Sequence, residues 1–230
     1  MSQPQPITRT YRVVMAILSV IVRRWGRLEV SGRELLLAPG PILLAANHDS
    51  YWDPVAGGIA ALPARQIRAL AKASLWKVKG LHWTLTGMGQ IPVTRGVGDT
   101  GAFDRAIAEL SAGACIGLFP EGTRSLGRPL RARSGFGRLA AAVPDARLVS
   151  CAITGTTDIA RFPRRPRIHV RFFAPAGGGL QPGESPADVS ARVLAELRAL
   201  APVTPAGRRP SEPAGDADAC RRGRGTRERS

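Results

Sequence analysis

The sequence is poor in cysteine and in aromatic residues, and each shortage excludes a class of protein. The three cysteines, Cys115, Cys151 and Cys220, include no Cys-x-x-Cys pair and cannot all be bridged internally. This argues against a disulfide-stapled secreted module and against a cysteine zinc site. Cys115 and Cys151 lie in apolar runs and are predicted to be core residues. Aromatic residues make up 5% of the chain, too few for the stacking platforms of a nucleic-acid binder.

Negative charge is also scarce. The 230 residues contain 33 Lys and Arg against 17 Asp and Glu, which gives a formal net charge of +16. Such a chain favours polyanionic partners: nucleic acid, an anionic membrane surface or a phosphorylated substrate. The length suits one domain with tails, and an apolar share of 44% is enough to bury a core.

The first apolar run, Val13–Val22, is too short to cross a bilayer, since a spanning helix needs roughly 20 apolar residues. It lacks the small-residue cleavage site of a signal peptide. We predict that residues 1–27 form an interfacial helix on the cytoplasmic face of the cell membrane, in a peripheral or monotopic arrangement. The alternative is a first helix packed on the core with solvated ends. Arginines flank the run on both sides: Arg9, Arg12, Arg23, Arg24 and Arg27.

Residues 28–200 alternate short apolar runs with helical stretches. This pattern predicts an α/β domain with a central sheet, mostly parallel or mixed, flanked by helices. After Ala201 the chain is rich in Pro, Gly and Arg, and residues 201–230 are predicted to be a disordered tail. The predicted strands are Ile42–Ala46, Ile67–Ala71, Gly89–Val93, Cys115–Phe119, Leu148–Thr154 and Arg167–Phe173. The predicted helices are Asp53–Ala61, Leu75–Leu85, Asp99–Ser111, Gly135–Ala142 and Ser185–Leu200.

A histidine and an aspartate follow the predicted strand Ile42–Ala46. The segment reads NHDSYWDP and places His48 after the strand and Asp53 at a helix start. The carboxylate can fold back to one ring nitrogen and fix the tautomer, which leaves the other nitrogen as a base toward an external hydroxyl. No Ser or Cys nucleophile is evident beside the pair, which favours direct attack by that hydroxyl over a covalent intermediate. The alternative is a simple capping arrangement.

Two further predicted strands end near an arginine. FPEGTRS offers backbone N–H groups around Gly122 and the guanidinium of Arg124, both suited to phosphate oxygens. Glu121 can orient Arg124 or accept a hydrogen bond from a substrate hydroxyl. GQIPVTR places Arg95 just beyond another strand. Each segment by itself also fits an ordinary turn with a solvated charge or a local ion pair.

Together, NHDSYWDP, GQIPVTR, FPEGTRS and VSCAITGT resemble in order and spacing the four sequence blocks of the glycerolipid acyltransferase family, in particular its PlsC type. The resemblance covers about residues 28–171 and leaves out the Arg-rich tail. It implies that His48 and Asp53 are the catalytic pair. The fourth block is assigned packing and acyl-pocket roles. The implied substrate-binding residues, chiefly for a phosphate, are Glu121, Gly122, Thr123, Arg124, Arg95 and Lys72.

The resemblance further implies transfer of a fatty acyl group from a thioester to the sn-2 hydroxyl of 1-acylglycerol-3-phosphate, giving phosphatidic acid. The donor, acyl-CoA or an acyl-carrier protein, would be a co-substrate, with no cofactor and no metal. The implied partners are a lysophospholipid acceptor and an anionic membrane surface, without nucleic acid. The alternatives are a related acyltransferase acting on another lysophospholipid, a glycolipid or an acylated sugar, and a non-enzymatic polyanion-binding protein. Consumption of a thioester distinguishes an acyltransferase from a non-enzymatic binding protein.

Overall fold

The structure, a computed structural model, describes residues 5–94, 99–159 and 165–203. The predicted site residue Arg95, Cys220 and most of the predicted tail, 204–230, lie outside these ranges. The strands are β1 (Arg27–Ser31), β2 (Ile42–Ala46), β3 (Ile67–Lys72), β4 (Ile91–Val93), β5 (Cys115–Leu118), β6 (Arg147–Thr154) and β7 (Arg167–Phe173). The α-helices are α1 (Arg9–Trp25), α2 (Asp53–Ala61), α3 (Leu81–Gly87), α4 (Thr100–Ser111), α5 (Gly135–Ala142) and α6 (Pro186–Leu200). Short 3-10 helices cover Arg33–Leu36, Ala73–Lys77 and Thr156–Asp158.

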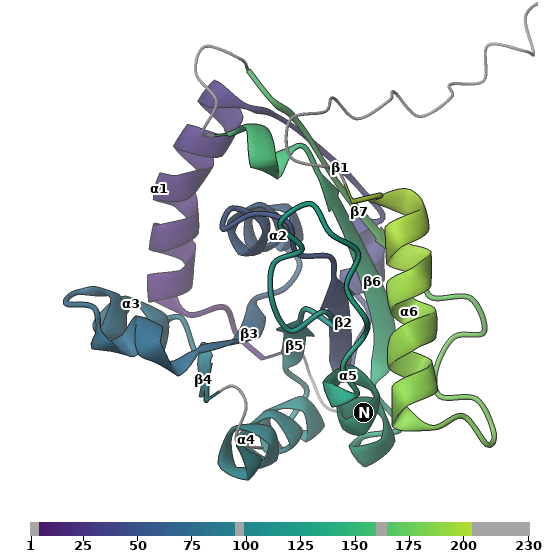
Figure 1. Cartoon of the computed structure of the whole chain (residues 1–230). Helices are drawn as coiled ribbons and strands as arrows, with labels where there is room; N and C mark the ends of the chain where they lie inside the picture. Colours follow the sequence, from purple (N-terminus) through teal and green to yellow (C-terminus); the bar gives the residue numbers. More distant parts are fainter. Residues whose placement is uncertain (1–4, 95–98, 160–164, 204–230) are drawn as a thin grey trace, which may run out of the picture.

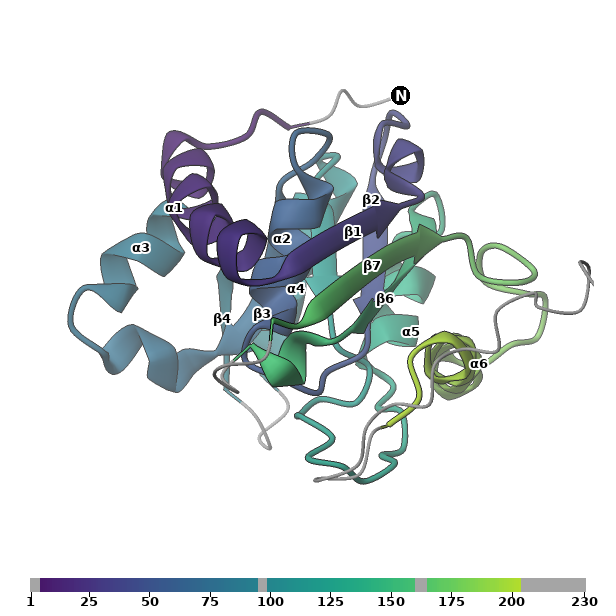
Figure 2. The same cartoon turned by 90° about the horizontal axis from the view of Figure 1, so that it is seen from above.

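The described strands form one seven-stranded sheet in the order β1-β7-β6-β2-β5-β3-β4. Neighbouring strands run parallel except β6 and β7, which are antiparallel. In Figure 1, α1 and α2 lie on one side of the sheet and α6 lies on the other. The view from above in Figure 2 shows the twist of the strands between these helices. The mixed α/β sheet predicted from the sequence is confirmed.

Strand β2 lies inside the sheet and is buried on both faces. Leu43 and Ala45 belong to the core under α4, α5 and α6, whereas Ile42 and Leu44 belong to the core under α1 and α2. A strand covered on both sides reads as a continuous apolar run, which explains the sequence ILLAA. The free thiols of Cys115 and Cys151 are buried, as predicted. Burial raises the pKa of Cys115 to about 12, so this thiol stays protonated at neutral pH.

One prediction about the elements was wrong, and one strand was missed. The sequence predicted one helix over Leu75–Leu85, but the structure has a 3-10 helix that ends at Lys77 and then α3, which begins at Leu81. Gly80, between them, has φ +81°, a left-handed conformation that interrupts a right-handed helix. The sequence analysis also missed β1. This five-residue strand pairs with β7 at the edge of the sheet.

Helix α1 has a buried face and an exposed apolar face. Tyr11, Met15 and Val22 are 1%, 5% and 1% exposed and pack in the same core as α2. Val13 and Ile17 on the other face are 58% and 62% exposed. The core-packed arrangement therefore accounts for the buried face of the helix, whereas the apolar residues of the other face stay exposed among the described residues. Within the described residues, no helix is both long enough and apolar enough to span a membrane.

Candidate active site

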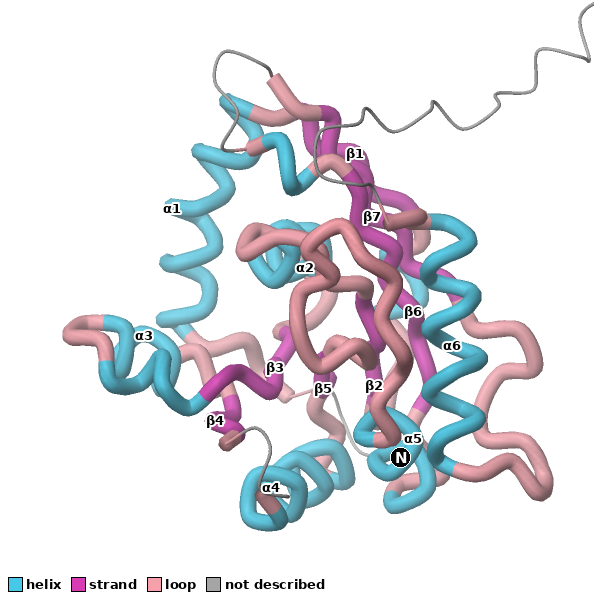
Figure 3. Tube along the Cα trace, in the orientation of Figure 1, coloured by secondary structure: helices cyan, strands magenta, loops and turns pink. Residues whose placement is uncertain are grey.

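Three neighbouring parallel strands bring the candidate site residues to one edge of the sheet. His48 follows β2, Glu121 follows β5 and Thr156 follows β6, with β2 between the other two. The carboxyl ends of adjacent parallel strands meet at one edge, which is where α/β proteins bind ligands. Figure 3 shows the long loop between β5 and α5 beside the loop after β2. A hydrogen bond joins the two loops: the N–H of Ser125 donates to the carbonyl of His48 at 2.8 Å.

His48 and Asp53 form the predicted pair. The distance from Nδ1 of His48 to Oδ2 of Asp53 is 3.1 Å. The imidazole stacks on the ring of Phe119, with centroids 4.0 Å apart and an interplanar angle of 14°. The histidine side chain is 11% exposed and the aspartate side chain 0%. Because Nδ1 faces the carboxylate, Nε2 is the ring nitrogen available to a substrate hydroxyl.

Asp53 is fixed by donors on both carboxylate oxygens. Its Oδ2 accepts from the backbone N–H groups of Asp49 at 2.6 Å and Ser50 at 2.7 Å. Its Oδ1 accepts from the hydroxyl of Thr156. A buried carboxylate needs such partners to remain ionised. The bonds from the Asp49 and Ser50 N–H groups are those expected of a simple capping turn, the alternative prediction. They also hold the carboxyl group beside the imidazole of His48.

The loop that carries His48 is joined to β6 through Asn47. The side-chain Nδ2 of Asn47 donates to the carbonyl of Ile153, and its Oδ1 accepts from the Ile153 N–H, both at 2.8 Å. The amide thus continues the β2–β6 ladder by one step beyond the end of β2. In the fourth block, Cys151, Ala152 and Ile153 are buried, which agrees with the packing role predicted for this segment.

Glu121 pairs with a different arginine from the one that the sequence analysis named. Its Oε1 accepts from Nε of Arg198 at 3.1 Å and from a terminal nitrogen of that guanidinium at 2.5 Å. Its Oε2 accepts from the backbone N–H of His48 at 2.8 Å. The side chain is 0% exposed, and both oxygens are occupied by protein donors. Glu121 therefore holds the His48 loop. Of the two roles predicted for it, the pairing with Arg124 was wrong, and the contact with a substrate hydroxyl stays a prediction.

Asp49 completes a buried group of charges. Arg198 donates to both of its carboxylate oxygens at 2.9 Å, and Ser125 donates through its hydroxyl. Burial alone would raise the pKa of Asp49, but the hydrogen bonds from Arg198 and Ser125 outweigh it and leave the pKa below its usual value. Burial raises the pKa of Glu121, an effect that its bonds to Arg198 reduce but do not cancel.

Arg124 lies next to this group, on the outer side of the loop. Its guanidinium carbon is 3.6 Å from the centroid of the Tyr51 ring, and it donates to the Tyr51 hydroxyl at 2.9 Å. The N–H of Gly122 donates to the carbonyl of Phe119 at 2.9 Å, so this amide closes a turn. Thr123 is exposed. Among these groups, the guanidinium of Arg124 is the strongest anion ligand.

Lys72 lies at the same edge of the sheet as His48, two strands away from it. It is an exposed residue at the end of β3, in register with Val93 of β4, and β5 separates β3 from β2. The phosphate-binding roles predicted for Arg124, Arg95 and Lys72 stay predictions. Across the described ranges, no group of three or more His, Cys, Asp and Glu side chains could hold a metal ion.

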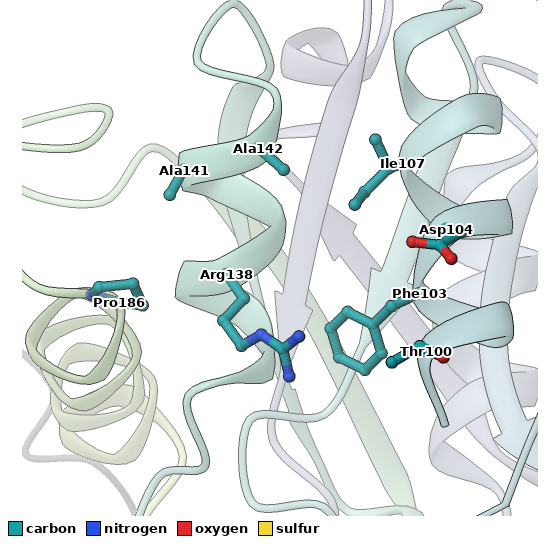
Figure 4. A pocket seen from close by; sticks show the side chains of 8 residues that line it. All are labelled: Thr100, Phe103, Asp104, Ile107, Arg138, Ala141, Ala142 and Pro186. Atoms are coloured by element: carbon teal, nitrogen blue, oxygen red, sulfur yellow. The ribbon is translucent and has the colours of Figure 1, made fainter. Parts of the chain in front are cut away.

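A cavity of about 250 Å³ lies between α4 and α5 (Figure 4). In it the guanidinium carbon of Arg138 is 4.8 Å from the centroid of the Phe103 ring. None of the predicted site residues that the structure describes lines this cavity, and neither His48 nor Asp53 is part of it. The lining residues are Thr100, Phe103, Asp104, Ile107, Arg138, Ala141, Ala142 and Pro186.

Sequence reasoning missed Thr156 and Arg198. Thr156 follows Gly155 at the end of the fourth block, and its proximity to Asp53 could have been inferred once β6 was placed beside β2. Arg198 is in the last turn of α6, 149 residues beyond Asp49, and no local pattern marks it. Its position depends on how α6 packs against the sheet.

The comparisons with known proteins agree with this geometry. Residues 27–154 match the family model described as "Acyltransferase". The chain is 30% identical over 115 residues to the 1-acyl-sn-glycerol-3-phosphate acyltransferase of Bacillus subtilis, covering 50% of this chain and 57% of that protein. It is 34% identical over 108 residues to the lyso-ornithine lipid O-acyltransferase of Pseudomonas aeruginosa, covering 46% and 39% respectively. The chain thus spans about half the length of the curated relatives it matches.

A solved structure shares the fold. The crystal structure of the 1-acyl-sn-glycerophosphate acyltransferase PlsC from Thermotoga maritima matches with a TM-score of 0.59 and 20% identity, covering 83% of this chain and 80% of that one. At this identity the likeness shows the shared architecture. The family match is independent of it and covers more than half of the sequence. As the four sequence blocks predicted, the chain belongs to the acyltransferase family.

Proposed function

We propose that the chain transfers a fatty acyl group from a thioester to the sn-2 hydroxyl of 1-acylglycerol-3-phosphate. The observation that carries this proposal is the buried His48–Asp53 pair, with an Nδ1–Oδ2 distance of 3.1 Å, in a chain of the acyltransferase family. The relative from Bacillus subtilis bears the name of this activity. The donor is acyl-CoA or an acyl-carrier protein.

The reaction follows from the orientation of the imidazole. Asp53 accepts the Nδ1–H, which leaves Nε2 unprotonated and able to take the proton of the acceptor hydroxyl. The hydroxyl oxygen forms a bond to the thioester carbonyl carbon, and the carbon–sulfur bond then breaks. The departing thiolate receives the proton from the imidazolium, so both atoms and charge balance. General-base assistance contributes typically 10² to 10⁴-fold, and positioning of the two substrates supplies much of the remainder.

Arg124 would hold the phosphate of the acceptor. A guanidinium can bind two phosphate oxygens at once, and this one lies beside the loop that carries His48. Cation–π contact with the Tyr51 ring keeps it near that loop while its edge stays available. A phosphate held there fixes where the free hydroxyl can reach.

The second candidate acceptor is a lyso-ornithine lipid. It is favoured by the 34% identity to the Pseudomonas aeruginosa protein named for that substrate. Such a lipid carries an amino-acid headgroup and no phosphate. The two candidates therefore make different demands on Arg124.

A thiol-release assay with a panel of acceptors tests the proposal. Acyl-CoA and acyl-carrier protein serve as donors, and the acceptors are 1-acylglycerol-3-phosphate, lyso-ornithine lipid and monoacylglycerol. We expect the fastest release with the phosphate acceptor. Release that is fastest with lyso-ornithine lipid would select the second candidate. Absence of release with every acceptor would contradict acyl transfer by this chain.

Arg124→Ala tests the acceptor contact itself. A charge-assisted hydrogen bond is worth about 1.5–3 kcal/mol, so the rate with 1-acylglycerol-3-phosphate should fall roughly 10-fold to 10²-fold while the residual rate with monoacylglycerol changes little. Tyr51→Phe is the matched control, because it keeps the ring under the guanidinium and removes the hydroxyl acceptor. Equal losses on both acceptors would assign Arg124 a structural role instead.

We further propose that the protein works at an anionic membrane surface, on the cytoplasmic face. The contact would be the α1–α3 surface, which we define as the exposed apolar side chains of α1 and of the segment from Leu75 to Trp83. Trp83 is 78% exposed, and exposed basic side chains lie on the same two segments, as suits contact with anionic headgroups. The apolar members are Val13, Ile17, Val20, Ile21, Leu75, Val78 and Trp83. The basic side chains are Arg9, Arg12, Arg23, Arg24, Lys77 and Lys79.

A further inference from the structure

Arg198 joins two separate loops at the candidate active site. It lies in the last turn of α6, on the side of the sheet opposite α1 and α2 (Figure 1). Its guanidinium contacts Asp49 through two nitrogens, both at 2.9 Å, and Glu121 through Nε at 3.1 Å. It also donates to the carbonyl of Ala201 at 3.1 Å. One side chain therefore ties the loop after β2, the loop after β5 and the end of α6.

Both residues that Arg198 binds through their carboxylates also form a hydrogen bond with one member of the catalytic pair. Glu121 accepts the backbone N–H of His48 at 2.8 Å. The backbone N–H of Asp49 donates to Oδ2 of Asp53 at 2.6 Å. Asp49 is also the neighbour of His48 in the chain. Arg198 is therefore linked to His48 through Glu121 and to Asp53 through Asp49. It makes no direct hydrogen bond to either member of the pair.

Charge explains why this position needs a cation. The side chains of Asp49 and Glu121 are 17% and 0% exposed and share one guanidinium. Without a cation the two carboxylates would repel each other in a poorly solvated site, and removing one partner of a buried ion pair is costly. Their bonds to Arg198 favour the ionised form of each and so lower the pKa of each against burial.

Arg198 lies in a segment beyond the residues that the family model matches. That match covers residues 27–154, whereas α6 begins at Pro186. The four sequence blocks thus supply the catalytic pair and the two carboxylates, but the cation between those carboxylates is supplied by the C-terminal helix.

We propose that Arg198 is the positioning residue of the site: by binding Asp49 and Glu121 together, it fixes the backbone on both sides of His48 and so holds the imidazole against Asp53. This proposal rests on the acyl transfer proposed above. A positioning role differs from a purely structural one because the imidazole orientation, and not simply the fold, depends on it. A misplacement of reacting groups by about 1 Å can cost 10²-fold in rate.

Arg198→Gln tests the proposal in the full chain. We expect kcat to fall roughly 10-fold to 10²-fold, with a smaller change in KM for the acceptor, because Arg198 does not contact substrate. The acid limb of the kcat–pH profile should move to higher pH, since loss of the guanidinium raises the pKa of Asp49 and of Glu121. A folded variant with the wild-type kcat would overturn the proposal. A lower kcat with an unshifted pH profile and an unchanged imidazole would also overturn it.

The matched control is Arg192→Ala. Arg192 lies on the same helix and is similarly engaged, with Nε donating to Glu184 at 2.7 Å and a terminal nitrogen to the carbonyl of Ala176 at 2.6 Å. Its hydrogen-bond acceptors lie before α6, and Glu196, 4.0 Å from it, lies one turn further along α6. None of these residues belongs to the Asp49–Glu121 group, so kcat and the pH profile should be those of the wild type. If Arg198→Gln does not fold, Arg198→Lys replaces it. One ammonium cannot make all the contacts of the guanidinium, so kcat should fall several-fold, and an unchanged kcat would overturn the proposal.

A measurement without substrate separates this inference from the proposed function. Nitrogen-15 NMR of the histidine rings reports the tautomer of His48, with His48→Ala assigning its signals. We expect the Nδ1–H tautomer in the wild type and a mixture of tautomers in Arg198→Gln. If the wild type consumes no thioester, the proposed function fails, while the ring spectrum still decides whether Arg198 orients His48. An identical His48 spectrum in both proteins would refute the positioning role.

Discussion

Asp53 is 0% exposed, and its neighbours supply the hydrogen bonds that a buried carboxyl group needs. Two backbone N–H groups, the hydroxyl of Thr156 and Nδ1 of His48 all face its oxygens. These donors offset the loss of hydration that an isolated buried carboxylate would suffer. The side chain of Asp53 is therefore held in one position, from which it can orient the imidazole of His48.

At the residue scale the first prediction concerns His48. Replacing His48 by Ala removes the proposed base, so kcat should fall by at least about 10², as measured by thiol release. The control is His169→Ala, because His169 is exposed and pairs with Glu29 at 3.1 Å on the edge of the sheet. A folded His48→Ala protein with normal turnover would disprove the mechanism.

Thr156 provides the second prediction. Thr156→Val keeps the shape of the side chain but removes the hydroxyl that donates to Asp53, so one oxygen of a buried carboxylate loses its partner. A lost hydrogen bond to a charged group costs about 1.5–3 kcal/mol, and we expect kcat to fall with it. Thr156→Ser retains the donor and should restore most of the activity. If the Val and Ser variants are equally active, Asp53 does not depend on this hydroxyl.

The sequence predicted the residues whose partners are near in the chain. His48 and Asp53 are five positions apart, one just after β2 and the other at the first residue of α2, so their contact follows from local geometry. Glu121 was placed at the site, but of its two predicted partners, Arg124 and a substrate hydroxyl, the arginine was wrong. The true partner, Arg198, is 77 residues away from it. Such a contact is determined by tertiary packing, which no local pattern encodes.

At the element scale too, features with local sequence signals were predicted and a feature that depends on tertiary pairing was missed. The bounds of β2, β7, α2 and α5 were predicted from apolar runs and helix-start residues, because these elements are bounded by clear turn or capping signals. Strand β1 was missed because its burial alternates between exposed and half-buried residues and it follows α1 after a single glycine. An edge strand of this kind is stabilised by pairing with β7 and not by a strong intrinsic pattern.

Helix α6 gives the element-scale prediction, because its packing on α5 sets the position of Arg198. A Cβ added at Gly137 would lie 1.9 Å from the carbonyl oxygen of Pro186, the first residue of α6. Gly137→Ala should therefore push the helices apart and lower the free energy of unfolding by roughly 1–3 kcal/mol, measured by urea denaturation. Helix propensity alone would favour alanine. We also expect kcat to fall, since α6 carries Arg198.

The control for this substitution is Gly179→Ala, where an added Cβ meets nothing within 4 Å. That variant should keep the wild-type stability and kcat. Equal stability of Gly137→Ala and Gly179→Ala would show that α5 and α6 are not packed as closely as described.

At the scale of the whole molecule, α1 packs one face on the core and exposes apolar side chains on the other face. Removal of α1 would uncover the core that contains Tyr11 and Met15, so a deletion would confuse loss of folding with loss of membrane contact. Substitution on the exposed face separates the two effects. Ile17 is 62% exposed and leaves the core intact when it is changed.

Ile17→Glu should weaken sedimentation of the protein with anionic vesicles, because it places a charge in the middle of the α1–α3 surface. Leu37→Glu is the matched control: Leu37 is 66% exposed, lies outside that surface, and changes the net charge by the same amount. Raised salt should release part of the wild-type protein but not all of it, since salt screens the arginines and leaves the apolar contact. If Ile17→Glu sediments as well as Leu37→Glu, the α1–α3 surface is not the anchor. Membrane contact would then depend on the basic residues elsewhere, and it should be abolished by salt alone.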